Sequence, residues 1–463
     1  PECDVTQVSP REIFSDGVLR QSDAELPQVT EPEVVRHYTN LSSKNHHVDK
    51  DVYPLGSCTM KYNPKVNDSI AQLAGFQHAH PLQPSETIQG ALAVMWGLEN
   101  QLRAVTGMSR FTLQPAAGSQ GELVGVLIMH KYHSLKGNSK KTILIPDTAH
   151  GTNPASVAMA GYNVVQIKSN AEGRVDIQDL KANLSEEVAG MMLTQPNTVG
   201  LFESDIEEIT ALIHSVDGLI YMDGANLNAI LGIVRPAQMG FDIVHINLHK
   251  TFSTPHGGGG PGAGPIGVVE RLEQFLPVPL VKKTDSGYEW DYDLPDTVGR
   301  VHAFYGNFGI LVRAYTYISM LGKEGLATIS RQAILNANYL KTKIEDAYEL
   351  YQSAHCMHEF VATASRQKKN GVKALHIGKR LLDFGFHAPT VYFPISVPEA
   401  MMIEPTESET KESLDRFAAA LLQIDSESES DPDLVINSPY GTPVRRLDEA
   451  AANRKPDLRW RSE

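Results

Sequence analysis

Three shortages in the sequence narrow what the chain can be: few cysteines, no long apolar run, and no signal-like start. Among 463 residues there are three cysteines, Cys3, Cys58 and Cys356, which lie far apart and in no metal-ligand spacing. They indicate reduced thiols in a cytoplasm-like compartment. The best apolar run, Ala91 to Leu98, is much shorter than a membrane span, and Pro1 to Asp4 lacks the basic and apolar regions of a signal peptide. We therefore expect a cytoplasmic protein without a membrane partner.

Positive charge is also scarce. Lysine and arginine total 41 against 55 acidic residues, which gives a net charge of −14. No block of basic residues is long enough to build a positively charged face, so we expect no nucleic-acid partner. The hydrophobic fraction of 41% with 21% charged residues is typical of a folded protein and excludes global disorder.

Helix-like segments and short apolar strands alternate through the middle of the chain, residues 85–330. Five segments have the composition of strands and are mostly bounded by Gly, Pro, Asp or Asn: 142–145, 164–167, 191–194, 219–222 and 243–246. This alternation predicts a large α/β domain with a mainly parallel sheet and helices on both faces. In such sheets, ligands bind at the carboxyl ends of the strands.

The flanking segments have a different character. Residues 1–84 are predicted to form an N-terminal arm and linker, because the first part is polar; a loosely ordered tail would look the same. Residues 331–463 predict a smaller α+β domain.

Three local features are expected around this second domain. A long helix is expected over Leu326 to Tyr351. Thr406 and Glu409 have the spacing of a capping box for a later helix. The acidic run Asp425 to Asp433, which alternates with serine, is interpreted as a solvated linker.

The most informative stretch runs from Ile243 to Gly267. A buried strand is expected to end near His249-Lys250 and to continue into a loop with seven glycines. A buried lysine is costly unless it is paired or used, and burial favours the neutral amine that attacks an aldehyde. Glycines let the backbone approach a ligand closely, but the lysine precedes them, so the loop is not a Walker A motif. Taken alone, the stretch also fits a surface lysine before a flexible loop.

Three other positions favour the first interpretation. Asp223 ends a strand 27 residues before Lys250, where a carboxylate can keep a pyridine nitrogen protonated, although Asp-Gly is also common in turns. Ser119 opens a helix whose free N–H groups suit a phosphate, and a plain N-cap is the alternative. His150 lies between a strand and a helix, where its ring can stack on an aromatic cofactor or be merely structural.

The order and spacing of these features resemble the fold type I enzymes that use pyridoxal phosphate, the class of aspartate aminotransferase. Longer motifs resemble the P-protein family of the glycine cleavage system, glycine dehydrogenase (decarboxylating). These motifs cover about residues 50 to 460: Gly56–Lys61, Ala117–Glu122, Ala149–Pro154, Asp223–Asn228, His249–Gly262 and Ile403–Glu409. The full-length form of that family is about twice this size, so the chain resembles subunit 2 of the split form, the half that keeps the lysine.

The resemblance implies a cofactor, a reaction and partners. The cofactor is pyridoxal 5'-phosphate; glycine loses its carboxyl group as CO2, and the aminomethyl group passes to the lipoyl disulfide of H-protein. The implied partners are glycine, lipoylated H-protein and a homologous, lysine-free subunit 1 in an α2β2 assembly. Two alternatives stay open. One is another fold type I aminotransferase or amino-acid decarboxylase, for which Arg300 and Arg313 are available as carboxylate ligands; the other is a non-catalytic regulatory subunit that retains the cofactor loop.

The resemblance also carries roles to single residues. Lys250 would hold the cofactor as a Schiff base, Asp223 would pair with its ring nitrogen, and His150 would stack on its ring. Ser119 and Gln120 would bind the phosphate, and His249 would lie beside the cofactor. Asn197 would bond the phenolic oxygen. Thr59, Lys61 and His80 would line the entrance for glycine or the lipoyl arm. The alternative is that these three are ordinary loop residues. No metal ligand is expected.

Overall fold

The computed structural model describes residues 8–22, 24, 26–256, 261–352 and 354–458. Cys3 and the glycines at 257–260 of the expected loop lie outside these residues. The described residues before His46 and after Thr442 form one unit, and residues 46–442 form a second, larger one. Within the described ranges, none of the helices combines the length and the apolar character that a membrane crossing requires.

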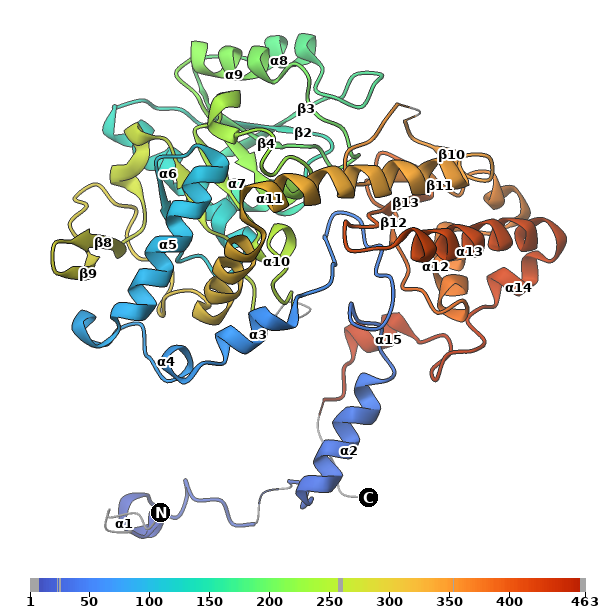
Figure 1. Ribbon diagram of the computed structural model, residues 1–463, viewed down its shortest axis with the longest axis horizontal. Coiled ribbons are helices and arrows are strands. Elements are labelled where there is room, and N and C mark those ends of the chain that lie inside the picture. The colour runs from blue at the N-terminus through green and yellow to red at the C-terminus, as the bar shows by residue number, and fades with distance from the viewer. Residues whose placement is uncertain (1–7, 23, 25, 257–260, 353, 459–463) are drawn as a thin grey trace. The chain divides into compact units, whose positions relative to one another are not determined.

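The larger unit contains a seven-stranded sheet with the order β1-β7-β6-β5-β4-β2-β3, of which β2, β3 and β4 are labelled in Figure 1. The strands of this sheet are β1 (Arg110–Thr112), β2 (Thr142–Pro146), β3 (Asn163–Ile167), β4 (Val188–Thr194), β5 (Leu219–Asp223), β6 (Ile243–His245) and β7 (Ile266–Val268). β3, β2, β4, β5 and β6 pair in parallel, whereas β7 is antiparallel to both β6 and β1. The predicted mainly parallel α/β sheet is confirmed, and all five expected strands belong to it.

Helices cover both faces of this sheet. They are α5 (Gln89–Thr106), α6 (Gly118–Leu135), α7 (Thr152–Met159), α8 (Ile177–Asn183) and α9 (Ile206–Ser215). Val124 of α6 and Val157 of α7 pack in one apolar core, and Leu92 of α5, Leu180 of α8 and Ile209 of α9 pack in another. Because both faces are covered, β4 is buried at every residue, and the strand ends are left to form a site.

A long helix, α11 (Phe308–Ile344), leads from this sheet to the C-terminal region (Figure 1). Gly322 interrupts it with a φ of 60°. Leu326 packs in a core of the large sheet, and Leu340 packs in the core of the second sheet. The division predicted at 330/331 therefore falls within a helix that serves both cores, and it stays a prediction. The expected helix over 326–351 ends early, because Tyr348 turns into the second core and its hydroxyl bonds to a backbone carbonyl of α13.

The C-terminal region is built on an antiparallel sheet with the order β10-β11-β13-β12. Its elements are β10 (Glu349–Leu350), β11 (Phe360–Thr363), β12 (Thr390–Val391), β13 (Ala400–Ile403), α12 (Ala374–Asp383), α13 (Lys411–Ser430) and α14 (Pro432–Ile436).

Two expectations for this region are wrong. The acidic run 425–433 is not a linker but the end of α13 and the start of α14, and buried Glu427 accepts a hydrogen bond from Arg380 Nε at 2.9 Å. The N-cap of α13 is Thr410, whose hydroxyl accepts the Ser413 N–H. Thr406 has a left-handed φ of 62°, which does not suit the extended backbone of an N-cap.

The segment expected to be an arm divides at His46. After it come α3 (Lys65–Ala71), α4 (Ala74–Gln77) and the 3-10 turn Ser85–Thr87, and Val52 packs in the second core. The remaining hairpin of the larger unit is β8 (Leu280–Thr284) with β9 (Gly287–Asp291). The terminal unit holds α1 (Pro10–Ile13), α2 (Glu31–Ser42) and α15 (Glu449–Arg454), whose residues are all at least partly exposed.

Candidate active site

A cavity of about 290 Å³ opens where β4, β5 and β6 end. The side chains around it are mostly polar and come from strand ends, from the start of α6 and from loops: Ser57, Cys58, Ala117, Gly118, Ser119, Glu122, His150, Thr152, Thr194, Thr198, Asp223, Ala225, Asn226, His245, Asn247, His249, Lys250, His256 and Gly262. The volume is close to the lower end for small-molecule sites, about 300–1,000 Å³. This is the edge of the sheet at which the sequence predicts a ligand.

Lys250 lies in this cavity but not on a strand. β6 ends at His245, and the chain turns into a single helical turn, α10 (Leu248–Thr251), which carries the lysine. Its Nζ donates to the Ser57 carbonyl at 2.8 Å, and the Ser57 N–H donates to Glu359 at 2.7 Å. The side chain is thus held by the loop that forms the cavity wall, and 8% of the residue is exposed.

Asp223, the last residue of β5, presents a buried carboxylate to the same cavity. It accepts the Ala225 N–H at 3.0 Å and the Asn153 amide at 3.3 Å, and His245 Nε2 lies 3.4 Å away. Burial opposes ionisation, but His245 and the Ala225 N–H outweigh it and hold the pKa of Asp223 below its usual value. A permanent negative charge therefore lies at the end of β5.

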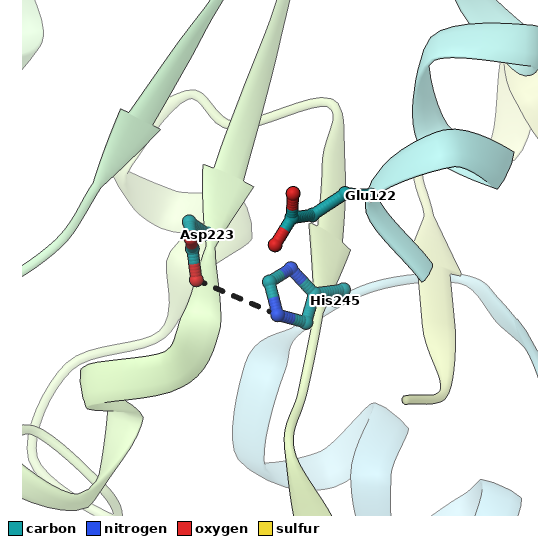
Figure 2. Close-up of side chains that lie close together, drawn as sticks. All are labelled: Glu122, Asp223 and His245. Atoms are coloured by element: carbon teal, nitrogen blue, oxygen red, sulfur yellow. Dashed lines mark ion pairs between the residues drawn. The ribbon is translucent and has the colours of Figure 1, made fainter. Parts of the chain in front are cut away.

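His245 supports Asp223 from the neighbouring strand (Figure 2). Burial keeps the Tyr221 hydroxyl protonated by raising its pKa well above the usual value, so this hydroxyl donates to His245 Nδ1 at 2.5 Å. Nε2 then carries the ring proton, bonds to Asn247 Oδ1 at 2.6 Å and faces Asp223. Burial foremost lowers the pKa of His245, while the nearby Asp223 carboxylate acts in the opposite direction.

Glu122 of α6 points toward the His245 ring from the other side (Figure 2). Burial, followed by the negative charge of Asp223, raises the pKa of Glu122 to about 7. The ligand atoms of Glu122, Asp223 and His245 lie within 4.8 Å of one another, a spacing that would also suit a metal ion. The two ring nitrogens are already engaged by Tyr221 and Asn247, so a hydrogen-bonded network explains the cluster better. It holds the Asp223 carboxylate charged and places Glu122 near the balance between its ionised and protonated forms at neutral pH.

The start of α6 offers the donors that a phosphate needs. Its N-cap is Ala117, whose methyl group cannot cap, so the first helical N–H groups are left for a ligand. A Cβ at Gly118 would lie 2.4 Å from Asn247 Nδ2, so the close approach requires glycine there. Thr194 also lines the cavity, and its buried hydroxyl has no hydrogen-bond partner among the described residues. Amine, carboxylate, open helix start and spare hydroxyl together fit a phosphorylated pyridine aldehyde.

Two histidines stand around these groups. His150 Nδ1 lies 2.8 Å from the Thr152 hydroxyl; the residue is exposed to solvent, but the packing around its ring foremost, with the Lys250 charge second, lowers its pKa. His249 accepts the Ala263 N–H at 3.4 Å, and burial, again with Lys250 second, lowers its pKa to about 3. Both rings are therefore neutral at pH 7.

The structure brings Lys250, Asp223, His150, Ser119 and His249 together, but it does not bring Gln120 or Asn197 to the cavity. The Gln120 amide accepts the Ala116 N–H at 2.7 Å and donates to the Val301 carbonyl. The Asn197 amide is used within its own loop, where it donates to the Gly173 carbonyl at 2.9 Å and accepts two backbone N–H groups. Their expected cofactor contacts stay predictions.

The three residues expected at the entrance also lie off the cavity. The Thr59 hydroxyl donates to Glu404 at 2.6 Å, and the buried Lys61 ammonium binds Glu407, Asn228 and the Thr251 carbonyl. His80 is exposed, and its ring stands edge-on to Phe304. Thr59 and Lys61 instead hold the loop that carries Ser57 and Cys58 in the cavity wall. Their role at the entrance likewise stays a prediction.

Several cavity residues were not assigned from the sequence. They are chiefly Glu122, Asn226, His245 and Asn247. Glu122 and Asn226 lie within motifs on which the family resemblance rests, so these motifs could have indicated that both residues belong to the site. His245 and Asn247 lie five and three residues before the lysine, but nothing local shows that their side chains turn toward Asp223.

The chain matches two family models and several curated proteins. The family model for the glycine cleavage system P-protein matches residues 6–288, and that for the glycine dehydrogenase C-terminal domain matches residues 329–435. The probable glycine dehydrogenase (decarboxylating) subunit 2 of Prosthecochloris aestuarii is 59% identical over 96% of this chain and 93% of that protein. The protein of the same description from Chloroherpeton thalassium is 56% identical over 99% and 94%.

Solved structures agree on the fold. A crystal structure of glycine decarboxylase (P-protein) of the glycine cleavage system, in inhibitor-bound form, has a TM-score of 0.76 at 19% identity, over 90% of this chain and 95% of that one. The glutamate decarboxylase of Lactobacillus brevis has a TM-score of 0.68 at 12% identity, over 91% and 97%. At these identities the likeness establishes the fold and no more.

Proposed function

The chain belongs to the glycine cleavage system P-protein family, and from this membership we propose that it decarboxylates glycine and passes the aminomethyl group to the lipoyl disulfide of H-protein. It is an enzyme that depends on pyridoxal phosphate, of the kind named glycine dehydrogenase (decarboxylating) subunit 2. The observation that carries the proposal is the meeting of Lys250, Asp223 and the open start of α6 in one cavity.

When bound, pyridoxal phosphate supplies an aldehyde carbon that condenses with amines and a protonated ring that accepts the electron pair left by a departing carboxyl group. Lys250 is the amine that would hold the aldehyde carbon, and Asp223 would keep the proton on the ring nitrogen. Ser119 and the first N–H groups of α6 would receive the phosphate. His150 would cover one face of the ring, and the loop at Ser57 would exclude water from the lysine.

A small substrate suits this cavity. The rival enzymes considered above commonly use an arginine for the substrate carboxylate, and among the described residues none of the cavity-lining side chains is an arginine. Arg313 pairs with Asp68 at 2.7 Å on α3, away from the cavity. Glycine needs no side-chain pocket, so a cavity near the lower size limit is sufficient for it beside the cofactor.

The decisive experiment measures glycine-dependent CO2 release by the chain with its cofactor, with and without a candidate subunit 1 and lipoylated H-protein. We expect release that requires all components and is lost in Lys250→Ala. Faster release from a larger amino acid would support the other decarboxylase. Amino transfer to a keto acid without CO2 would support an aminotransferase, and a colourless protein that gains no pyridoxyl label with borohydride would support the regulatory subunit.

We also propose a stable partner, a homologous subunit 1 in a two-plus-two assembly. In the terminal unit, α2 exposes a stripe of apolar side chains on one face: Val34, Tyr38 and Leu41, at 38%, 66% and 43%. An isolated helix of 12 residues is marginal in water, so this one needs a surface to pack against. Co-expression and size-exclusion chromatography test the assembly. Tyr38→Asp should weaken it, and Arg36→Asp on the opposite face should not; a complex that tolerates both would remove α2 from the interface.

H-protein is proposed to bind only transiently, with its lipoyl arm entering near Lys250. We also propose a cytoplasmic location, which the free thiols of Cys58 and Cys356 support. Fractionation of cells that produce the chain tests the location directly.

A further inference from the structure

Glu122 is a buried acid that the proposed reaction does not yet use. It lies on the first turns of α6, with 4% of the residue exposed. The Thr152 hydroxyl lies 2.8 Å from its Oε1, and the same hydroxyl lies 2.8 Å from His150 Nδ1. Three side chains therefore form a continuous hydrogen-bonded row from the interior to a ring that lines the cavity.

A hydroxyl in the middle of such a row can point either way. If Glu122 is ionised, the Thr152 proton points to the carboxylate, and His150 must donate from Nδ1. If Glu122 is protonated, it donates to Thr152 Oγ1, Thr152 donates to Nδ1, and the His150 proton moves to Nε2. The protonation of Glu122 is thus tied to the tautomer of His150.

The groups around Glu122 favour a balance between these two arrangements. Facing it are Asp223 and Tyr221 from β5, His245 from β6, Lys250 from α10, and Ser156 from α7, whose hydroxyl lies 3.4 Å from Oε2. Burial and Asp223 raise the pKa of Glu122 to about 7, whereas Thr152, Ser156 and Lys250 act in the opposite direction. The Thr152 N–H also approaches His150 Nδ1 at 3.3 Å, which favours Nδ1 as an acceptor and the proton on Nε2.

We propose that Glu122 and Thr152 are positioning residues that set the His150 tautomer and return a proton to His150 whenever its Nε2 proton is given to the reaction. Nε2 has no hydrogen-bond partner among the described residues, and His150 lines the cavity, so this nitrogen is available to a reacting group. The inference rests on the proposed function for the identity of the proton acceptor, a thiolate.

The proton count of the proposed reaction calls for such a donor. As CO2 leaves, the electron pair of the carbon–carbon bond forms a carbon–sulfur bond, and the disulfide bond breaks with its electron pair on the leaving sulfur. That thiolate takes the proton of His150 Nε2. Thr152 passes its hydroxyl proton to Nδ1, and Glu122 passes its carboxyl proton to Thr152. His150 stays neutral throughout, and Glu122 ends as a carboxylate.

The tautomer is measured directly, without turnover, by magic-angle-spinning NMR of the assembled holoenzyme labelled with ¹⁵N-histidine. The resonances of His150 are identified by their loss in His150→Gln. In the unchanged enzyme we expect the ring proton to move from Nε2 to Nδ1 as the pH rises through about 7. Glu122→Gln and Thr152→Val should abolish this change, and Thr152→Ser should restore it. Ser156→Ala, which removes a hydroxyl outside the row, should keep the change but move its midpoint to a higher pH.

Kinetics give a second readout that a merely structural role would not move. Thr152→Val should lower kcat for aminomethyl transfer at least about tenfold, less than the ~10²–10⁴ of a direct general acid, with KM for glycine nearly unchanged. Thr152→Ser should recover most of it. A His150 tautomer independent of pH, or a Thr152→Ser enzyme as slow as Thr152→Val, overturns the proposal. If no enzyme form acts on glycine but the tautomer switches as described, the proposed function fails while the link between Glu122 and His150 stands.

Discussion

Replacing Lys61 with methionine is expected to destabilise the larger unit strongly. The Lys61 side chain is 2% exposed, and its ammonium binds Glu407 at 2.5 Å, Asn228 Oδ1 at 2.9 Å and the Thr251 carbonyl at 2.9 Å. Methionine fills a similar volume but leaves a buried carboxylate and two acceptors without their donor. Breaking a buried pair from one side costs about 3–5 kcal/mol.

This cost translates into a measurable shift in melting temperature. At about 2.1 cal/mol/K per residue, a unit of about 400 residues unfolds with an entropy of about 0.8 kcal/mol/K. Lys61→Met should therefore lower the midpoint by about 4–6 °C in calorimetry of the assembled protein. Lys65→Met is the matched control, because its pair with Asp49 has the same length of 2.5 Å but a side-chain exposure of 58%. It should cost at most about 1 kcal/mol.

A second substitution separates the lone charge from lost packing. Glu407→Gln on top of Lys61→Met removes the uncompensated carboxylate and should recover much of the midpoint. Burial opposes the charge of Lys61, but Glu407 outweighs it and raises the pKa of the lysine, so the stabilisation is complete below about pH 10 and is lost only as the pH rises beyond. If Lys61→Met shifts the midpoint no more than Lys65→Met does, Lys61 is not a buried support of the cavity wall.

Further outcomes are expected at four residues. Borohydride reduction of the holoenzyme should place the pyridoxyl label on Lys250, and peptide mapping that finds it on another lysine would refute the assignment. Asp223→Asn should keep the fold but decarboxylate about 100-fold more slowly, which corresponds to losing two pKa units of stabilisation of the ring proton. Because the pKa of Asp223 is lowered, the unchanged enzyme should retain its cofactor as the pH falls to about 4, and absorbance titration measures this. His150→Ala should raise the cofactor dissociation constant by about threefold to tenfold through lost stacking, and an unchanged constant would exclude that role. Gly118→Ala should weaken cofactor binding more than it weakens folding, because its methyl group would displace Asn247 at the start of α6; unaltered fluorescence titration would show that this helix start does not hold the phosphate.

The chemistry of this protein was readable from local strings of residues. Ser119, His150, Asp223 and Lys250 follow one another along the chain in an order that a strand-and-helix alternation brings to one sheet edge, and the structure places all four at one cavity. The parallel sheet was predictable for a related reason. Its central strands β2, β4, β5 and β6 are buried, so each is a short, nearly continuous apolar run between turn residues, and that signal is local.

Local sequence patterns predicted the wrong structure where a residue contacts a partner that is distant in the sequence or where the backbone takes an unexpected conformation. The acidic run at 425–433 has the composition of a linker, but it is helical, with its other acidic side chains at least partly exposed and buried Glu427 compensated by Arg380 from another helix. The capping-box spacing at Thr406 is matched by chance, and the backbone of Thr406 makes Thr410 the N-cap instead.

The sequence by itself therefore determined which reactive groups the protein has and along which edge they gather. The tertiary structure decided which side chains face the cavity. Asn197 and Asn226 each lie three residues after the end of a buried strand, yet the path of the backbone turns Asn197 into its own loop and Asn226 toward the cavity. Lys61 is a buried support because tertiary packing brings Glu407, 346 residues further along the chain, to its ammonium group. A local sequence pattern around Lys61 cannot predict a contact with so distant a residue.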